Sequence, residues 1–414
     1  MKYKTSNTIP IVKIIRLTRL GPLQQQQCKA LLLESGKCYS DIIQYLNEKR
    51  ILKEYPSNSD VQKLFKGKYQ LHSQTIQAIT QKIDANIKSA ISNRKKEFEE
   101  SGYIKTEFPY KSKTTYPVFW KQFGISIKKD KLSLSNGVGR QSLGLNIPQE
   151  YLNLKITNVE LKYRAKEFYL HLTIDSGEEN PPILQGKNTC GIDLGEIHHA
   201  ACCTDKGEAL IISGRHLRSL KQQRNKQYKE ISFKLKGKKN KSSLKQARRK
   251  IGQKFRKQQR DILHKVSRQI TNFCVDNKIA VVAIGECSGT QDSPNLGKSN
   301  NQKISQWSRG QFINLIKYKL RRYGIKTNII PEDYSSRTCS ICKHVKNSST
   351  KGRTYTCSNC KNSVHRDGNG SANICSRSKY NEYGKVQLKS IKYLQPIKLG
   401  CSRAAASATA TYGS

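Results

Sequence analysis

Acidic residues are scarce in this sequence. Its 414 residues include 30 aspartates and glutamates against 76 lysines and arginines, which gives a formal net charge of +46. A folded chain with so few acids repels itself unless a polyanion neutralises it, and nucleic acid is the commonest polyanion that proteins bind. The composition therefore favours a nucleic-acid-binding protein, and we expect no small-molecule substrate.

Long apolar runs and secretion signals are also missing. The longest apolar stretch spans residues 279–284, far short of the ~20 residues that a membrane span needs, so we expect no membrane partner. The first apolar run is broken by Lys13 and Arg16, and no cleavage signal follows it. Thirteen cysteines, an odd number scattered along a long chain, do not fit a disulfide framework. We therefore expect a reduced, cytoplasmic protein.

Two kinds of pattern alternate in the first half of the chain. Short runs rich in β-branched residues, separated by glycine turns, predict strands, and apolar residues at helical spacing predict helices. The strand-like segments are residues 1–20 and 103–180, and we expect them to form a small β-barrel or sandwich. The helical segment, 21–102, would then be a lobe inserted into the strand domain.

The second half of the chain alternates strands with helices. This pattern covers residues 187–334 and resumes at 365–378, so we expect one α/β domain there. A cysteine-rich stretch, 335–364, interrupts that domain and is too short to hold an apolar core. The tail, 379–414, is polar, and we predict that it is disordered. Together these segments indicate a multidomain α+β fold.

Four cysteines in the interruption have the spacing of a metal site. They form two Cys-x2-Cys pairs separated by fourteen residues: Cys339, Cys342, Cys357 and Cys360. Two such pairs supply four thiolates to one tetrahedral zinc ion, and four protein ligands make the site structural rather than catalytic. Four unrelated core cysteines are the alternative, and His344 or His365 could replace one thiolate.

Three acidic residues lie at the edges of apolar elements, where an unpaired carboxylate is costly. Asp193 ends one expected central strand, Glu286 ends a second, and Asp367 lies in a turn that opens the final helix. Carboxylates from separate elements can converge on hard divalent cations, and a pair of such ions stabilises both reacting oxygens in phosphodiester cleavage. Taken singly, each acid could instead be a helix cap, a turn residue or an ion-pair partner.

One segment carries close to half of the excess positive charge. Residues 215–268 contain 21 lysines and arginines and only two acids, Glu230 and Asp261, so their net charge is +19. Because few acids are present to pair with, this helical stretch favours phosphate contacts over a merely solvated face. The residues that we expect to bind nucleic acid are Arg215, Arg218, Lys221, Arg224, Arg248, Arg249, Lys250, Arg256 and Arg260.

These motifs occur in an order that resembles a known family. The sequence has GIDLGE at Asp193, IGEC at Glu286, SSRTCSIC and CSNC at the cysteine pairs, and HRDGNGSAN at Asp367. In this order they resemble the TnpB nucleases of insertion sequences and the compact type V CRISPR effectors related to them. The stretch QFINLIKYKLRRYGI and the tetrapeptide HKVS are also similar. The likeness is strong over residues 191–374 and architectural over 1–174.

The resemblance implies a fold and a set of metal ions. The α/β part would be a RuvC nuclease domain of the RNase H type, in which Asp193, Glu286 and Asp367 bind two catalytic Mg²⁺ ions. The cysteine-rich stretch would be a zinc ribbon with one structural Zn²⁺, and the N-terminal strands a wedge-like barrel with an inserted recognition lobe. Lys343 and Lys361 stand where the family usually has glycine, a departure that bears on the shape of the cysteine turns.

The function that the resemblance implies is RNA-guided DNA cleavage by a metal-dependent endonuclease, with a guide RNA and a target DNA as partners. Two other functions stay open. A guided DNA-binding protein without cleavage would be favoured by loss of one of the three acids, and all three are present. A transposase or transposase accessory protein that works without RNA would be favoured by a catalytic tyrosine or a fourth acid, and the sequence marks neither.

Overall fold

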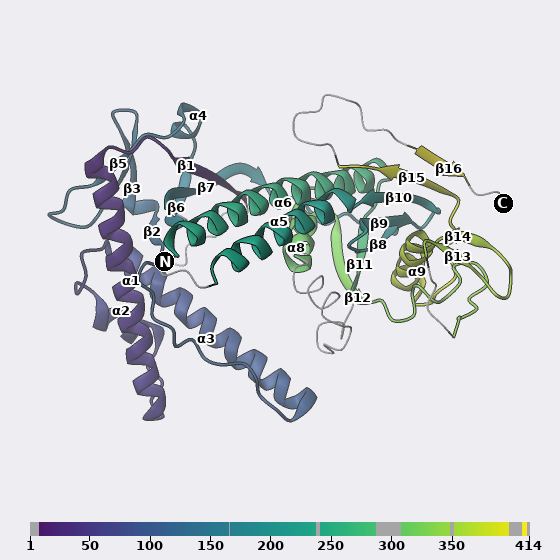
Figure 1. The fold of residues 1–414 in the computed structure, drawn as a ribbon, viewed down its shortest axis with the longest axis horizontal. Helices are drawn as coiled ribbons and strands as arrows, with labels where there is room; N and C mark the ends of the chain where they lie inside the picture. The colour runs from purple at the N-terminus through teal and green to yellow at the C-terminus, as the bar shows by residue number, and fades with distance from the viewer. Residues whose placement is uncertain are drawn as a thin grey trace. The chain divides into compact units, whose positions relative to one another are not determined.

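The computed structural model describes residues 8–164, 166–236, 241–286, 308–347 and 352–396, together with the backbone of 408–411. The chain divides into two compact units, Met1–Glu179 and Asn180–Ser414 (Figure 1). Each unit has its own apolar core. The mixed α+β, multi-unit fold class that the sequence indicates is confirmed. No described helix combines the length and the apolar character that crossing a membrane requires.

Unit 1 contains two antiparallel sheets. The larger has the strand order β1-β7-β6-β2; its members are β1 (Thr8–Leu17), β7 (Glu167–Glu179), β6 (Ile156–Arg164) and β2 (Val118–Lys121). The smaller consists of β3 (Ile125–Lys128), β4 (Lys131–Leu134) and β5 (Leu143–Leu145). Because β1 pairs with β7, segments from both sides of the helical stretch share one sheet. Closure of the sheets into a barrel stays a prediction.

The helices of unit 1 occupy the stretch between β1 and β2. They are α1 (Pro22–Ile51), α2 (Asn58–Phe65) and α3 (Ser73–Ser101), and a short helix, α4 (Gln149–Leu152), precedes β6. Ser57 caps α2 by accepting a hydrogen bond from Asp60 N, and α3 ends where Gly102 takes a φ of +66°. Helices and strands share a core around Trp120, which is fully buried and donates its indole N–H to Ser135 O at 2.8 Å.

Unit 2 is built on a seven-stranded sheet of order β12-β11-β8-β9-β10-β15-β16. Its strands are β8 (Thr189–Asp193), β9 (His198–Thr204), β10 (Glu208–Ser213), β11 (Val281–Glu286), β12 (Lys326–Pro331), β15 (Ser390–Leu394) and β16 (Ala408–Thr411). β8, β11 and β12 run parallel to one another. Their carboxyl ends therefore meet at one edge of the sheet, where open α/β sheets commonly bind their ligands.

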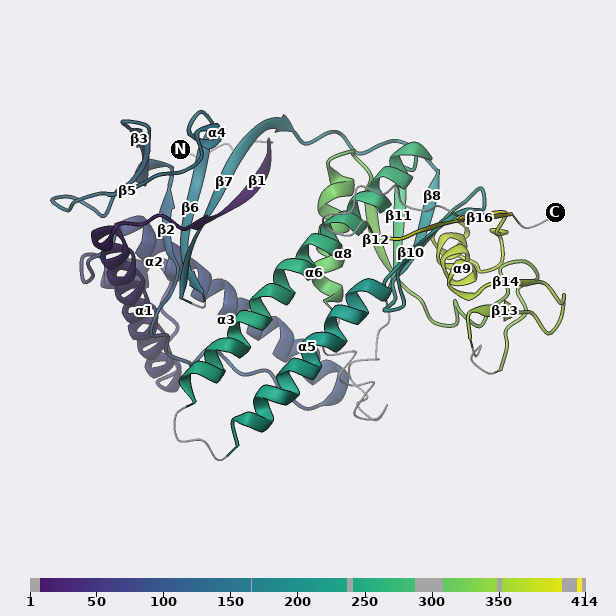
Figure 2. The same ribbon diagram turned by 45° about the horizontal axis from the view of Figure 1, so that its top comes forward.

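Helices cover both faces of this sheet (Figure 2). α6 (Ser242–Asp276) and α8 (Arg309–Arg321) pack on one face, and α9 (Arg366–Tyr380) packs on the other. α5 (Arg215–Lys234) packs beside α6. Side chains alternate between the two faces along β9: Cys202 belongs to the core under α6 and α8, whereas Ala201 and Cys203 belong to the core under α9.

Gly191 in β8 lets α9 lie directly against the sheet. A Cβ atom at this position would stand 2.3 Å from Cys375 N and 2.3 Å from Ser371 O, both in the backbone of α9. Cys375 also donates its thiol hydrogen to Thr189 O at 3.3 Å. Because Asp367 lies in the first turn of α9, the absence of a side chain at Gly191 determines how near Asp367 stands to the end of β8.

Residues 379–396 differ from the disordered tail that the polarity of 379–414 predicts; the rest of that segment, apart from the backbone of 408–411, lies outside the described residues. α9 continues to Tyr380, and β15 pairs in parallel with β10, so the tail adds a strand to the central sheet. Val386, Leu388 and Ile391 are buried there. Val386 and Leu388 precede β15, and Ile391 lies within it, so these apolar residues are scattered among polar ones and the overall polarity of the segment hides them.

Candidate functional site

A cavity of about 430 Å³ lies at the edge of the sheet where β8 ends. Asp193, the last residue of β8, lines it together with Asp367 from α9 and Glu332, which directly follows β12. Three arginines also line this cavity: Arg218, Arg353 and Arg366. The structure therefore brings two of the three predicted acids into one cavity, among several positive charges.

Asp193 is the most perturbed acid of the cavity. Burial, together with the negative charges of Glu332 and Asp367, raises the pKa of Asp193 to about 8. Gly370 leaves room for the carboxylate, because a Cβ there would stand 2.9 Å from Asp193 Oδ2. Carboxylates that crowd one another in this way are stabilised by a divalent cation, so these oxygen donors fit the hard metal ion that the resemblance implies.

Asp367 has partners that favour its charged form. Burial alone would raise the pKa of Asp367, but the hydrogen bond from His198 and the charges of His198, His365 and Arg353 outweigh burial and hold it below its usual value. His198 Nδ1 lies 2.6 Å from Asp367 Oδ2, and Arg353 Nη1 lies 3.2 Å from the same oxygen. The two aspartates therefore have pKa values displaced in opposite directions within one cavity.

Glu286 ends β11 at the same edge, but its side chain is exposed. In the described part of the chain it is Glu332, rather than Glu286, that lines the cavity. Glu332 reaches across the end of β11, since a Cβ at Gly285 would stand 2.4 Å from its Oε2 atom. The sequence analysis missed Glu332. The available signal was its position directly after the third parallel strand, one residue beyond the partner of Glu286 at the end of the second.

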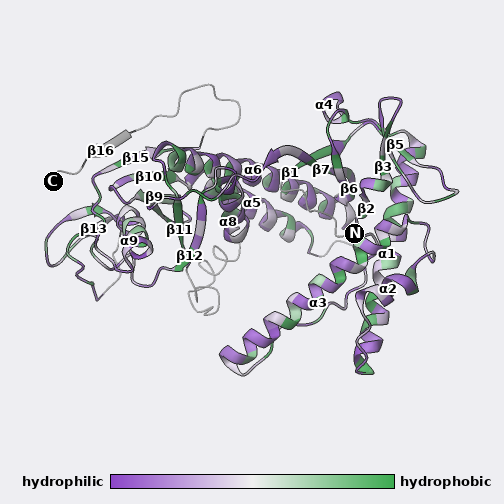
Figure 3. Ribbon diagram, turned by 180° about the vertical axis from the view of Figure 1, so that it is seen from behind, coloured by the Kyte–Doolittle hydropathy of each residue, from purple (hydrophilic) through white to green (hydrophobic). Residues whose placement is uncertain are grey.

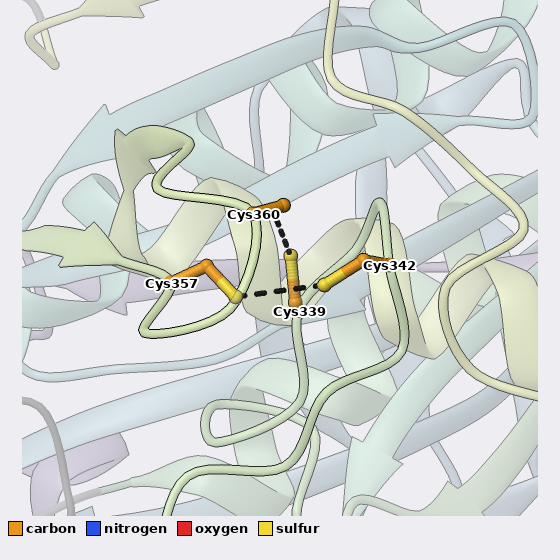
Figure 4. A group of neighbouring side chains, drawn as sticks. All are labelled: Cys339, Cys342, Cys357 and Cys360. Carbon is orange, nitrogen blue, oxygen red and sulfur yellow. Dashed lines mark hydrogen bonds between the residues drawn. The ribbon is translucent and has the colours of Figure 1, made fainter.

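The four cysteines converge from two turns (Figure 4). Their sulfur atoms all lie within 4.8 Å of one another, with 3.7 Å between Cys339 and Cys360 and 3.5 Å between Cys342 and Cys357. Zinc–sulfur bonds of about 2.3 Å in a tetrahedron place sulfurs roughly 3.8 Å apart, so the four thiols fit a zinc ion. The second turn lies between the strands of a short hairpin, β13 (Thr354–Thr356) and β14 (Ser363–His365).

Neither of the alternative histidine ligands joins this cluster. His344 Nε2 lies 2.8 Å from Ser358 Oγ, and His365 caps α9 by accepting a hydrogen bond from Asp367 N. Lys343 and Lys361 follow the cysteine pairs with φ values of +63° and +59°. Glycine adopts this left-handed conformation without strain, so the two departures from the family occur where the backbone itself favours glycine.

The cysteine turns are joined to α9 through two buried asparagines. Ser340 N donates to Asn369 Oδ1 at 3.0 Å, and Asn369 Nδ2 donates to Thr338 O at 2.8 Å. Asn373 Nδ2 also donates to Thr338 O, at 2.7 Å. Because Thr338 and Ser340 flank Cys339, the position of this cysteine and the position of α9 depend on each other.

The predicted basic residues lie on α5 and α6, two helices made largely of hydrophilic residues (Figure 3). Six of them are exposed: Arg215, Arg248, Arg249, Lys250, Arg256 and Arg260. Arg218 lines the cavity of Asp193. The guanidinium of Arg224 lies over the ring of Phe255, 4.3 Å from its centroid. Lys221 is buried, with its Nζ 3.8 Å from Glu196, and so does not offer its charge to a ligand at the surface.

Two family models match segments of the chain. Residues 171–291 match a probable transposase family of the OrfB_IS605 type, and residues 310–374 match a Cas12f1-like TNB domain. The first match contains Asp193 and Glu286, and the second contains the four cysteines and Asp367. A comparison with curated proteins found no match.

Solved structures resemble the chain in fold. The structure of a Cas12f1–sgRNA–target DNA complex matches with a TM-score of 0.60 at 16% identity, over 89% of this chain and 99% of that one. A CRISPR–Cas12f ternary complex matches with a TM-score of 0.39 at 16% identity, over 85% and 81% of the two chains. The fold comparison depends on the first of these. The resemblance to the TnpB and compact type V CRISPR effector family is therefore confirmed, by two family models and by the fold of most of the chain.

Proposed function

We propose that this protein is an RNA-guided DNA endonuclease with a metal-dependent RuvC site. The observation that carries the proposal is the convergence of Asp193 and Asp367 with Glu332 in one cavity, at the edge of the sheet where Glu286 also ends its strand. The fold of a Cas12f1 protein bound to a guide RNA and a target DNA supports the same function. We place this activity in the cytoplasm.

The acids of the cavity have a defined part in cleavage. Asp193, Asp367 and Glu286 would hold two Mg²⁺ ions, which when bound stabilise the charge that develops during phosphodiester hydrolysis. Glu332 lines the same cavity as Asp193 and Asp367 and adds its carboxylate to theirs. The arginines that line the cavity, Arg218, Arg353 and Arg366, would attract and orient the DNA backbone.

The exposed basic residues of α5 and α6 would bind the guide RNA through its phosphates. Sequence specificity would then come from base pairing between the guide and the target rather than from the protein. The zinc held by the four cysteines would be structural, because four thiolates leave no open position for a substrate.

The second candidate function is a transposase that works without RNA, and a fourth acid is one of the features expected of it. Glu332, which lines the cavity with Asp193 and Asp367, is an acid beyond the three predicted ones and so favours this function. The two functions differ in their need for RNA. They are separated by purifying the protein with its flanking locus and changing the guide segment of the RNA that copurifies.

Under the guided mechanism, cleavage moves to the site that matches the new guide segment. Asp193→Ala should abolish cutting while RNA and target binding stay nearly intact, because Asp193 lines the cavity and lies outside α5 and α6. Reversing two exposed charges, Arg248→Glu with Arg249→Glu, should weaken RNA binding. Cutting at unchanged sites by RNA-free protein would overturn the guided mechanism in favour of the transposase.

A further inference from the structure

A second group of side chains in the described chain has metal-binding chemistry. His198, His365 and Asp367 place one ligand atom each within 4.8 Å of one another. His198 begins β9, His365 ends β14, and Asp367 lies in the first turn of α9. The three side chains come from different elements, so it is the packing of the hairpin and α9 against the sheet that brings the two imidazoles to one carboxylate.

The three side chains lie close enough to reach a shared ion after small movements. His198 Nδ1 and Asp367 Oδ2 are 2.6 Å apart, which is a hydrogen-bond distance. An ion with bonds of about 2.1 Å holds adjacent ligand atoms roughly 3.0 to 3.4 Å apart, so these two atoms need to separate by less than about 1 Å to bind one ion. Asp367 N donates to His365 Nδ1 at 3.2 Å, which holds the ring beside the first turn of α9. Because this hydrogen bond occupies the lone pair of Nδ1, His365 binds an ion either through Nε2 or by giving up this hydrogen bond. Arg353 pairs with Asp367 as well, but 41% of its side chain is exposed, so it can move into solvent when a cation binds.

The donor types decide which cations suit this group. Mg²⁺ takes oxygen ligands and keeps several of its water molecules, whereas imidazole nitrogen suits first-row transition metals. A centre made only of carboxylates has no nitrogen with which to favour a transition metal. Two imidazoles beside Asp367 supply that preference at one end of the cavity.

We propose that His198 and His365 join Asp367 as ligands of one divalent first-row transition-metal ion, which makes this part of the cavity favour Mn²⁺ over Mg²⁺. The inference rests on the proposed function, in which Asp367 binds a catalytic ion. A different role for the histidines, orienting Asp367 through hydrogen bonds alone, predicts another result. Loss of an orienting histidine weakens Mg²⁺ and Mn²⁺ binding alike, whereas loss of a ligand nitrogen weakens Mn²⁺ binding selectively.

The experiment uses the full chain with zinc already bound by the cysteines. Mn²⁺ is titrated into the protein while the electron paramagnetic resonance signal of the free ion is recorded, and Mg²⁺ is then added as a competitor. We expect His198→Ala and His365→Ala each to weaken Mn²⁺ binding by about tenfold or more, with a smaller effect on Mg²⁺. His264→Ala removes an exposed histidine of α6 and serves as the matched control, with no effect on either ion.

Spin-echo spectroscopy of the bound Mn²⁺ gives a direct readout of the ligands. The wild-type protein should show coupling to imidazole nitrogen, and each single variant should show less. His198→Asn places an amide nitrogen where Nδ1 stands, so it keeps a donor for Asp367 while it removes the imidazole. This variant also serves if the alanine variant does not fold. Absence of nitrogen coupling, or equal weakening of both ions, would overturn the inference.

A DNA cleavage assay separates this inference from the proposed function. Nitrogen-coupled Mn²⁺ in a protein that does not cut DNA would support the metal site and overturn the nuclease. Metal-dependent cutting by a protein whose bound Mn²⁺ shows no nitrogen coupling would support the nuclease and overturn the proposed metal site.

Discussion

Replacing Gly191 by alanine tests the packing that positions α9. The added Cβ would stand 2.3 Å from two backbone atoms of α9, and backbone cannot turn aside as a flexible side chain can. Overfilling a packed core costs about 1–3 kcal/mol, and contacts this short place Gly191→Ala at the upper end of that range. The helix must shift away from β8, and Asp367 shifts with it.

Gly310→Ala is the matched control. Gly310 lies in α8 of the same unit, and nothing stands within 4 Å of the position where its Cβ would be. Alanine is a better helix former than glycine by up to about 1 kcal/mol, so this variant should be as stable as the wild type or slightly more so. The two substitutions are chemically identical and are expected to act in opposite directions.

Hydrogen exchange of peptides from α9 measures the effect. A loss of about 2 kcal/mol or more in the free energy of opening corresponds to roughly 30-fold faster exchange in Gly191→Ala. DNA cleavage should fall in the same variant because Asp367 is displaced. The argument that close packing at Gly191 holds the helix would be refuted if α9 of Gly191→Ala exchanged at the wild-type rate. It would also be refuted if Gly310→Ala changed the exchange rate of α9 by an equal amount.

Four further predictions concern the metal centres. Glu332→Gln should lower metal-dependent cleavage at least as much as Glu286→Gln, because Glu332 lines the cavity; a fully active Glu332→Gln enzyme in a titration of Mg²⁺ would contradict this role. Elemental analysis should find about one zinc per chain, and Cys357→Ser should lower zinc content, stability and activity together. Lys361→Gly should raise the free energy of unfolding by about 1 kcal/mol, because Lys361 holds a left-handed φ of +59° that glycine adopts without strain. An unchanged melting temperature would show that the turn is not strained. The pKa of Asp193 is raised to about 8, so the folded metal-free protein keeps a proton that the unfolded chain releases near pH 4. The contribution of Asp193 to the free energy of unfolding is therefore fully present below about pH 4 and is lost as the pH rises toward 8. With a chelator present, Asp193→Asn should flatten the plot of melting temperature against pH over this range.

Local signals were sufficient for part of the site. The spacing of the cysteine pairs is fixed by two tight turns, so the sequence alone predicts the cluster that Cys339 and its partners form. Asp193 could be predicted for a similar reason, because the sequence shows directly that an acid ends an apolar strand. Glu332 follows a strand that is only partly buried, and its approach to Asp193 depends on Gly285 in a neighbouring strand, which no local pattern reveals.

Other features depend on contacts between distant segments. Lys221 was predicted to bind nucleic acid, but it is buried, because it lies one helical turn after Leu217 on the inward face of α5. A count of charges along the segment does not distinguish the inward face of a helix from its outward face. β15 owes its place to parallel pairing with β10, a partner about 180 residues earlier in the chain. The meeting of His198 with Asp367 likewise requires the whole sheet.

The hydrogen bonds from Asn369 and Asn373 to the cysteine turns have a thermodynamic consequence. If zinc binding holds Thr338 and Ser340 in place, it also lowers the cost of ordering the first turns of α9, and with them Asp367. Binding at the two metal centres is then linked, and such linkage is reciprocal: each ion raises the affinity for the other by the same factor. An oxidant or chelator that removes zinc would thus lower the occupancy of the carboxylate centre without touching a single acid.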